Sequence, residues 1–139
     1  SKAGVKIDMI VRGICCLIPG VEGETENIHV ISVVGRFLEH SRIYIFGSKE
    51  RRKYYIASAD FMTRNTVRRV EVAAPVHDEH ARKKICHIFD TIMLDDEKGK
   101  EQRADGKYAD RKINSTPLDS QELFYKEAYD RTADAGSRR

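Results

Sequence analysis

The chain has 139 residues, of which 34% are charged, and its formal net charge is +3. This length is sufficient for one domain with a hydrophobic core, so we expect a single domain over residues 1–139. No apolar stretch approaches the roughly 20 residues that cross a bilayer, which excludes an integral membrane protein. The mild positive charge permits an anionic ligand without requiring one, and it gives little support to nucleic-acid binding.

The three cysteines, Cys15, Cys16 and Cys86, are odd in number and have no Cys-x-x-Cys spacing. The sequence therefore predicts neither a disulfide framework nor a zinc site, and the compartment we expect is the reducing cytoplasm. The chain enters an apolar run at residue 7 without a leader or a cleavage site. We therefore expect it to be a piece of a longer protein.

Residues 7–11 predict the first strand, and apolar side chains on both of its faces favour a central position in the sheet. A polar loop follows over residues 19–27. Residues 27–41 place apolar side chains at helical spacing after capping residues, and we expect a helix there. Their many β-branched residues leave a strand over residues 28–34 as the alternative.

Two β-type runs, residues 42–47 and 53–59, are separated by a polar connection and predict a hairpin. Residues 68–76 predict a further strand, which Pro75 stops. Asp78 then begins an expected helix over residues 78–96. The apolar residues of this helix share one stripe: Ala81, Ile85, Ile88, Phe89 and Ile92.

Asp105 and Gly106 predict a two-residue type I′ turn between two polar strands. A last helix is expected to start with a cap at Asp119 or Ser120, and residues 132–139 are expected to be frayed. The element order predicts an α/β or α+β fold, with a mixed β-sheet flanked by helices.

Arg12 directly follows the first strand, where α/β sheets collect ligands, and an arginine there can offer a planar fork to phosphate oxygens. A salt bridge to a surface acid is the alternative. His40 precedes the first strand of the expected hairpin. Taken alone, it is either a structural histidine or a residue held at the mouth of a strand for chemistry.

A downstream segment favours the second interpretation of His40. His40-Ser41-Arg42 and the "ASAD" segment around Ser58 resemble the His-x-Lys-x4-Asp and Gly-Ser-x-Asn parts of the phospholipase D superfamily motif, with Glu71 as its later glutamate. Arg42 stands at the lysine position and Gly47 at the aspartate position. An intact diesterase motif is therefore absent.

Four blocks carry a closer resemblance: "IVRGICCLIPG", "NIHVISVVGRFLEHSRIYIF", "IASADFMTRN" and "RRVEVAAPV". In order and spacing they resemble the carboxyl-terminal domain of bacterial polyphosphate kinase, and the long helix and the "ADGKY" hairpin resemble its tail. The fold that this resemblance implies is phospholipase D-like.

The resemblance implies an enzyme that reversibly transfers the terminal phosphoryl group of ATP to polyphosphate, with Mg²⁺ and through a phosphohistidine. In the family, that histidine and the Mg²⁺-binding residues lie in the preceding domain, so we expect no metal site in this chain and no activity of the chain alone. The implied partners are ATP or ADP, inorganic polyphosphate, the preceding domains and further copies in a homo-oligomer. No nucleic acid is implied, and peripheral membrane attachment of a cytoplasmic protein is left open.

By the same resemblance, Arg12 and His40 contact the nucleotide and its phosphates, and Arg69 is a third phosphate contact. His40 is also the expected catalytic residue, either as a hydrogen-bond donor or as a general acid or base. Three residues are expected to support His40 without touching the substrate: Ser58, Arg64 and Asn65. Two alternatives stay open, namely one half of a phospholipase D-type phosphodiesterase site and a non-catalytic anion-binding module.

Overall fold

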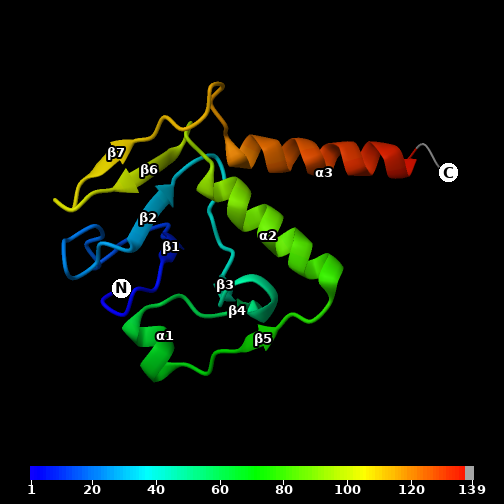
Figure 1. Ribbon diagram of the computed structural model, residues 1–139. Helices are drawn as coiled ribbons and strands as arrows, with labels where there is room; N and C mark the ends of the chain where they lie inside the picture. Colours follow the sequence, from blue (N-terminus) through cyan, green and yellow to red (C-terminus); the bar gives the residue numbers. More distant parts are fainter. Residues whose placement is uncertain (137–139) are drawn as a thin grey trace. The chain divides into compact units, whose positions relative to one another are not determined.

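The computed structural model describes residues 1–136 and divides into two compact units. Unit 1 comprises Ser1–Glu39 together with the chain from Thr91 onward, and unit 2 comprises His40–Asp90. Each unit has its own β-sheet (Figure 1). The mixed α/β content predicted from the sequence is confirmed, with the strands divided between two sheets.

Unit 1 contains the mixed sheet, in the order β1-β2-β6-β7. Strand β1 (Ile7–Ile10) pairs in parallel with β2 (Ile28–Val33), and β6 (Gly99–Gln102) pairs antiparallel with both β2 and β7 (Tyr108–Asp110). The central position predicted for the first strand is wrong within the described chain, because β1 lies at an edge of this sheet. Its four residues are half-buried, so apolar side chains on both faces did not require a neighbour on each side.

The helix predicted over residues 27–41 is also wrong, and the alternative of a strand is correct. Its β-branched side chains fit a pleated surface better than a helix. Val30 and Ile31 in β2 are fully buried and Val33 nearly so, which makes β2 the centre of the small apolar core of unit 1.

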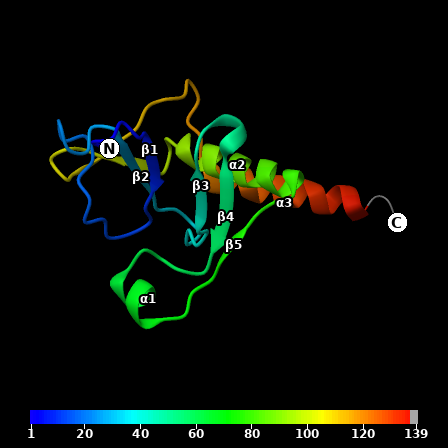
Figure 2. The same cartoon turned by 60° about the horizontal axis from the view of Figure 1, so that its bottom comes forward.

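Unit 2 contains an antiparallel sheet in the order β3-β4-β5. The predicted hairpin is confirmed as β3 (Ile43–Phe46) and β4 (Lys53–Ala57), joined through the short 3-10 turn η1 (Lys49–Arg51). Strand β5 (Ala73–Pro75) is shorter than expected and ends at the proline (Figure 2). The short helix α1 (Thr63–Arg68), which the sequence did not predict, lies between β4 and β5 in the chain.

The two longer helices have the caps that the sequence predicted. The amide of Ala81 donates to Asp78 Oδ1 at 2.7 Å at the start of α2 (Glu79–Met93), where Ile85 and Ile92 are buried. Asp119 Oδ1 accepts from the amides of Gln121 and Glu122, at 2.9 and 3.1 Å, at the start of α3 (Ser120–Gly136). None of the helices described is long and apolar enough to span a membrane.

The connection between β6 and β7 differs from the predicted type I′ turn. Gly106 donates its amide to Arg103 O at 2.8 Å, and Arg103 donates to Lys107 O at 2.9 Å. Three residues therefore form the loop, with Gly106 last and at a φ of 78°, as in a turn followed by a glycine bulge. The fraying expected from residue 132 stays a prediction, because α3 continues to Gly136 and residues 137–139 lie outside the described chain.

A closed polar network follows α2 in unit 1; we call it the Asp95 network. Asp95 is fully buried, and its Oδ1 accepts from the amides of Lys98 and Gly99 at 2.8 and 2.9 Å. Its Oδ2 accepts from the amide and the hydroxyl of Ser120 at 2.8 and 2.6 Å, and its backbone carbonyl accepts from Arg111 Nη1 at 2.7 Å. These bonds join the end of α2 to the start of α3.

Asp96 extends the network on its exposed side. Its two carboxylate oxygens accept from the amides of Ile113, Asn114 and Leu118 and from the Asn114 side chain, at 2.8 to 3.0 Å. These hydrogen bonds, with the Asn114 side chain first, hold the pKa of Asp96 far below its ordinary value.

Candidate functional site

The segment that leads into His40 is held by side chains from two other parts of unit 1. Arg12, two residues beyond β1, donates from Nη1 to the carbonyl of Glu39 at 2.6 Å. This carbonyl belongs to the peptide bond that joins Glu39 to His40. The buried Gln121 donates to Phe37 O at 2.8 Å and to Glu39 Oε1 at 2.7 Å. Arg12 and Gln121 therefore fix the backbone just ahead of His40.

His40 is exposed and lies three residues before β3, so it is not a core histidine. Its imidazole contacts the guanidinium of Arg42, with 2.8 Å between Nδ1 and Nη1 and 3.3 Å between Nε2 and Nη2. Arg42 Nη1 also donates to the backbone carbonyl of His40 at 3.2 Å. The strand-mouth position inferred for His40 is therefore the one it has.

Arg42 binds Asp60 with its other edge. Nε lies 3.1 Å from Oδ1 and Nη2 lies 3.1 Å from Oδ2, which makes a two-bonded fork between side chains that are only 17% and 25% exposed. The pairing of β3 with β4 explains this contact. Because Ile43 stands opposite Ile56 and Ala57 donates to Arg42 O, the start of β3 lies beside the end of β4, where the chain continues to Asp60.

We refer to His40, Arg42 and Asp60 as the His40 cluster. The pair of Arg42 and Asp60 was not predicted as part of a site. The signal was present, because Arg42 stands at the lysine position of the phospholipase D-like motif and Asp60 at its asparagine position. What the sequence could not supply was their direct contact.

Tyr44 borders the His40 cluster. Its hydroxyl donates to Ala59 O at 3.3 Å, and its ring packs at a tilt against Phe61, with 5.7 Å between centroids. Burial raises the pKa of Tyr44, the Asp60 carboxylate raises this pKa further, and the Arg42 cation opposes both effects. Tyr44 therefore stays a neutral hydrogen-bond donor on one side of the cluster.

Ser58 contacts Glu71 rather than His40. Its hydroxyl donates to Glu71 Oε2 and accepts from the amide of Val72 at 3.0 Å, and its own amide donates to Val72 O at 3.0 Å. These bonds tie the end of β4 to the chain ahead of β5. Two motif positions, the serine and the later glutamate, are thereby brought together.

The remaining predicted site residues lie in and directly after α1. Asn65 is 4% exposed, its amide donates to Met62 O at 2.9 Å, and its side-chain oxygen has no partner among the described residues. Arg64 and Arg69 are exposed. Within residues 1–136, no hydrogen bond or ion pair joins any of these three to His40, so their roles stay predictions. The same is true of a site shared by Arg12 and His40, because the two residues belong to different units.

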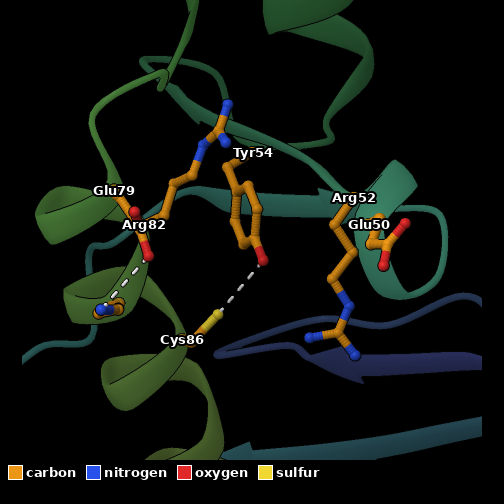
Figure 3. A pocket seen from close by; sticks show the side chains of 7 residues that line it. Glu50, Arg52, Tyr54, Glu79, Arg82 and Cys86 are labelled. Atoms are coloured by element: carbon orange, nitrogen blue, oxygen red, sulfur yellow. Dashed lines mark hydrogen bonds and ion pairs between the residues drawn. The ribbon is translucent and has the colours of Figure 1, made fainter.

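A separate pocket of about 400 Å³ lies in unit 2 (Figure 3). It is lined by Glu50, Arg52, Tyr54, Glu79, Arg82, Lys83 and Cys86. Figure 3 shows Arg82 beside the Tyr54 ring, 5.5 Å from its centroid, and the Cys86 thiol 3.7 Å from the Tyr54 hydroxyl. Glu50 and Glu79 offset two of the three positive charges that line this pocket.

The donor sets of the described residues do not fit a resident metal ion. No group of three or more His, Cys, Asp or Glu side chains within residues 1–136 is arranged to hold one.

The fold and the motif contacts place the chain in a phospholipase D-like class. The chain belongs to the polyphosphate kinase family, because the family profile described as "Polyphosphate kinase C-terminal domain 2" matches residues 1–121. It is 48% identical to the polyphosphate kinase of Staphylococcus epidermidis over 128 residues, which cover 92% of this chain and 17% of that protein. It is also 48% identical to the enzyme of Bacillus cereus over 133 residues, covering 95% of this chain and 19% of that protein.

A solved structure shares the fold. The crystal structure of polyphosphate kinase from Porphyromonas gingivalis superposes on this chain with a TM-score of 0.84 at 37% identity. The superposed region covers 94% of this chain and 20% of the Porphyromonas gingivalis chain. The chain therefore spans about a fifth of the length of the relatives it matches.

Proposed function

We propose that this chain is the carboxyl-terminal part of an enzyme that reversibly transfers the terminal phosphoryl group of ATP to inorganic polyphosphate. The family membership supports the reaction class. The observation that carries the assignment within this chain is the His40 cluster, in which an exposed imidazole at a strand mouth contacts an arginine that is itself bound by an aspartate. The phosphorylated histidine belongs to the preceding domains in this proposal.

The chemistry of phosphoryl transfer fits this division of labour. Charge spreads over the equatorial oxygens of the transferred group, so positioned donors and cations supply much of the catalysis. In this chain, His40 contacts a phosphate oxygen, Arg12 contributes a guanidinium fork, and Arg69 is a third phosphate contact. Bound Mg²⁺ would neutralise phosphate charge, and its ligands lie in the preceding domains.

The charge distribution supports an anionic substrate for unit 2. Residues 40–90 contain eleven Lys and Arg against six Asp and Glu, a net charge of +5. The rest of the chain contains fourteen against sixteen, a net charge of −2. The positive excess of the chain is therefore carried by the unit that contains His40, which favours a polyanion there.

The remaining parts of the proposal concern the whole protein. The full-length enzyme is expected to be a cytoplasmic homo-oligomer, with peripheral attachment to the membrane left open. The isolated chain is expected to make no polyphosphate and to accept no phosphate from ATP, because binding energy at one wall of a site cannot replace a missing covalent intermediate.

The test uses the full-length protein and ATP labelled in its terminal phosphate. Incorporation of label into an acid-insoluble polymer, with an acid-labile and alkali-stable phosphoenzyme intermediate, is the expected result. Hydrolysis of a phosphodiester without polymer formation would instead assign the phosphodiesterase function. Label taken up stoichiometrically by the 139-residue chain alone would overturn the placement of the nucleophile in the preceding domains.

A further inference from the structure

We propose that Asp60 and Arg42 are positioning residues for His40: Asp60 fixes the guanidinium plane of Arg42, and Arg42 fixes the ring of His40. The proposal rests on the proposed function, because it gives these residues a role in the reaction through His40. Neither residue needs to contact the substrate.

The first step is the fork between Arg42 and Asp60. Two parallel bonds of 3.1 Å use Nε and Nη2 and leave the guanidinium no freedom to rotate about its long axis. The pair is only 17% and 25% exposed, unlike the mobile surface pairs that contribute little. The fork therefore sets the plane in which Nη1 points.

The second step is the contact of that plane with His40. Nη1 lies 2.8 Å from Nδ1 and also donates to the His40 carbonyl at 3.2 Å, so one nitrogen holds both the ring and its backbone. The two ring nitrogens point in diverging directions, and a guanidinium cannot meet both in line. The contact at Nδ1 is the shorter one, so we take Nδ1 as the main acceptor, and Nε2 lies 3.3 Å from Nη2 of the same guanidinium.

The third step concerns the proton on the ring. A guanidinium only donates, so the nitrogen that it meets must carry a lone pair. With Nδ1 as the acceptor, the neutral ring carries its proton on Nε2. Arg42 therefore sets which way the exposed imidazole faces, and this orientation decides how the ring meets a phosphate oxygen.

The backbone supplies an independent reason for the precision of the cluster. Arg42 reaches Asp60 because β3 and β4 are paired in register, and Arg42 itself donates to the His40 carbonyl. Both the ring and the main chain of His40 are therefore fixed. A misplacement of about 1 Å in such a group can cost about 100-fold in rate.

The experiment measures kcat and KM for polyphosphate synthesis by the full-length protein. Asp60→Asn keeps the shape of the side chain but removes one acceptor for Arg42, and Arg42→Lys keeps the charge but removes the fork. Each change is expected to lower kcat by about tenfold or more, with KM for ATP within about threefold of the wild type. The matched controls are Asp90→Asn and Arg68→Lys, at exposed positions of the same unit, and both should leave kcat unchanged.

Coupling to His40 separates a positioning role from a structural one. In a His40→Ala background, Asp60→Asn is expected to cause no further loss, because the residue through which it acts is gone. The same fold-loss in both backgrounds would overturn the proposal, and so would an Asp60→Asn enzyme within twofold of the wild type. A loss of kcat in Asp60→Asn that is accompanied by a drop in its thermal midpoint would also overturn the proposal. A wild-type protein that makes no polyphosphate would refute the proposed function instead.

Discussion

The Asp95 network of unit 1 and the His40 cluster of unit 2 both contain a central aspartate. The first is buried and closed, whereas the second ends at an exposed side chain. In the Asp95 network, a fully buried carboxylate accepts from three backbone amides and a serine hydroxyl. Those donors belong to the loop and helix start that the carboxylate joins. In the His40 cluster, the aspartate binds one arginine, which in turn holds a solvent-facing imidazole.

This difference separates two uses of the same residue type. A closed network stabilises a loop and leaves nothing for a ligand to contact. An open network stops at an exposed side chain, here the imidazole of His40, which a ligand can contact. We therefore expect changes in the first to reduce folding stability, and changes in the second to reduce activity at nearly constant stability.

The largest effect on folding is expected from Asp95→Ala. This change leaves the buried amides of Gly99 and Ser120 and the part-buried amide of Lys98 without their acceptor, and buried groups cost about 1–3 kcal/mol each when unsatisfied. We predict a loss of at least about 3 kcal/mol in the free energy of unfolding, measured by urea denaturation of the chain. Asp90→Ala, at an exposed position, is the control and should change it by less than about 0.5 kcal/mol.

A second way to break the closed network is Gly99→Ala. An added Cβ would lie 2.2 Å from the carbonyl oxygen of Asp95 and 3.0 Å from its carbon, so the backbone must shift. We predict a loss of about 2–3 kcal/mol in the same denaturation experiment. Gly13→Ala is the matched control, because nothing lies within 4 Å of its added Cβ. Equal free energies of unfolding for the two variants would show that the backbone around Asp95 shifts without loss of stability.

Asp96 gives the comparison a pH dependence. Its folded-state pKa is held far below the value of about 3.9 for an unfolded aspartate, so the unfolded chain binds the extra proton first. The stabilisation is therefore complete above about pH 4 and is lost as the pH falls toward the folded-state pKa. We predict that the stability difference between wild type and Asp96→Ala is constant from pH 5 to 8 and shrinks below pH 4. A difference that grows on acidification would contradict this sign.

The smallest effect is expected from Ser58→Ala. The lost hydroxyl accepts from the amide of Val72 and donates to Glu71, at an exposed position where water can replace it. We predict a loss of about 1 kcal/mol or less in the free energy of unfolding. Ser41→Ala, also exposed, serves as the control. A loss as large as that of Asp95→Ala would mean that water does not replace the hydrogen bonds of Ser58 at the end of β4.

Local signals predicted the elements where one pattern dominated. The caps at Asp78 and Asp119 and the hairpin of β3 and β4 were all readable, because each depends on a few neighbouring residues. Residues 28–33 satisfied both a helical spacing and a β-branched composition, and the packing of Val30 and Ile31 in the sheet decided between the two. The edge position of β1 depended on strand order, which no local pattern contains.

The candidate site was predicted in part. The exposed position of His40 at a strand mouth followed from its motif and from the hairpin. Arg42 and Asp60 are 18 residues apart in the chain, and predicting their contact would have required the register of β3 and β4. Ser58 was expected to support His40, but its hydroxyl donates to Glu71. The backbone bond from Ser58 to Val72 at the end of β4 holds the hydroxyl on that side.

The most direct test of the central claim is a paired measurement on full-length His40→Ala, which follows polyphosphate synthesis and the thermal midpoint on the same preparation. The account predicts a loss of turnover of about 100-fold or more, with a midpoint within about 1 °C of the wild type, because an exposed imidazole contributes little packing. His80→Ala, an exposed histidine on α2, should change neither quantity. Normal turnover of His40→Ala, or inactivity that comes with a collapse of the midpoint, would contradict the account.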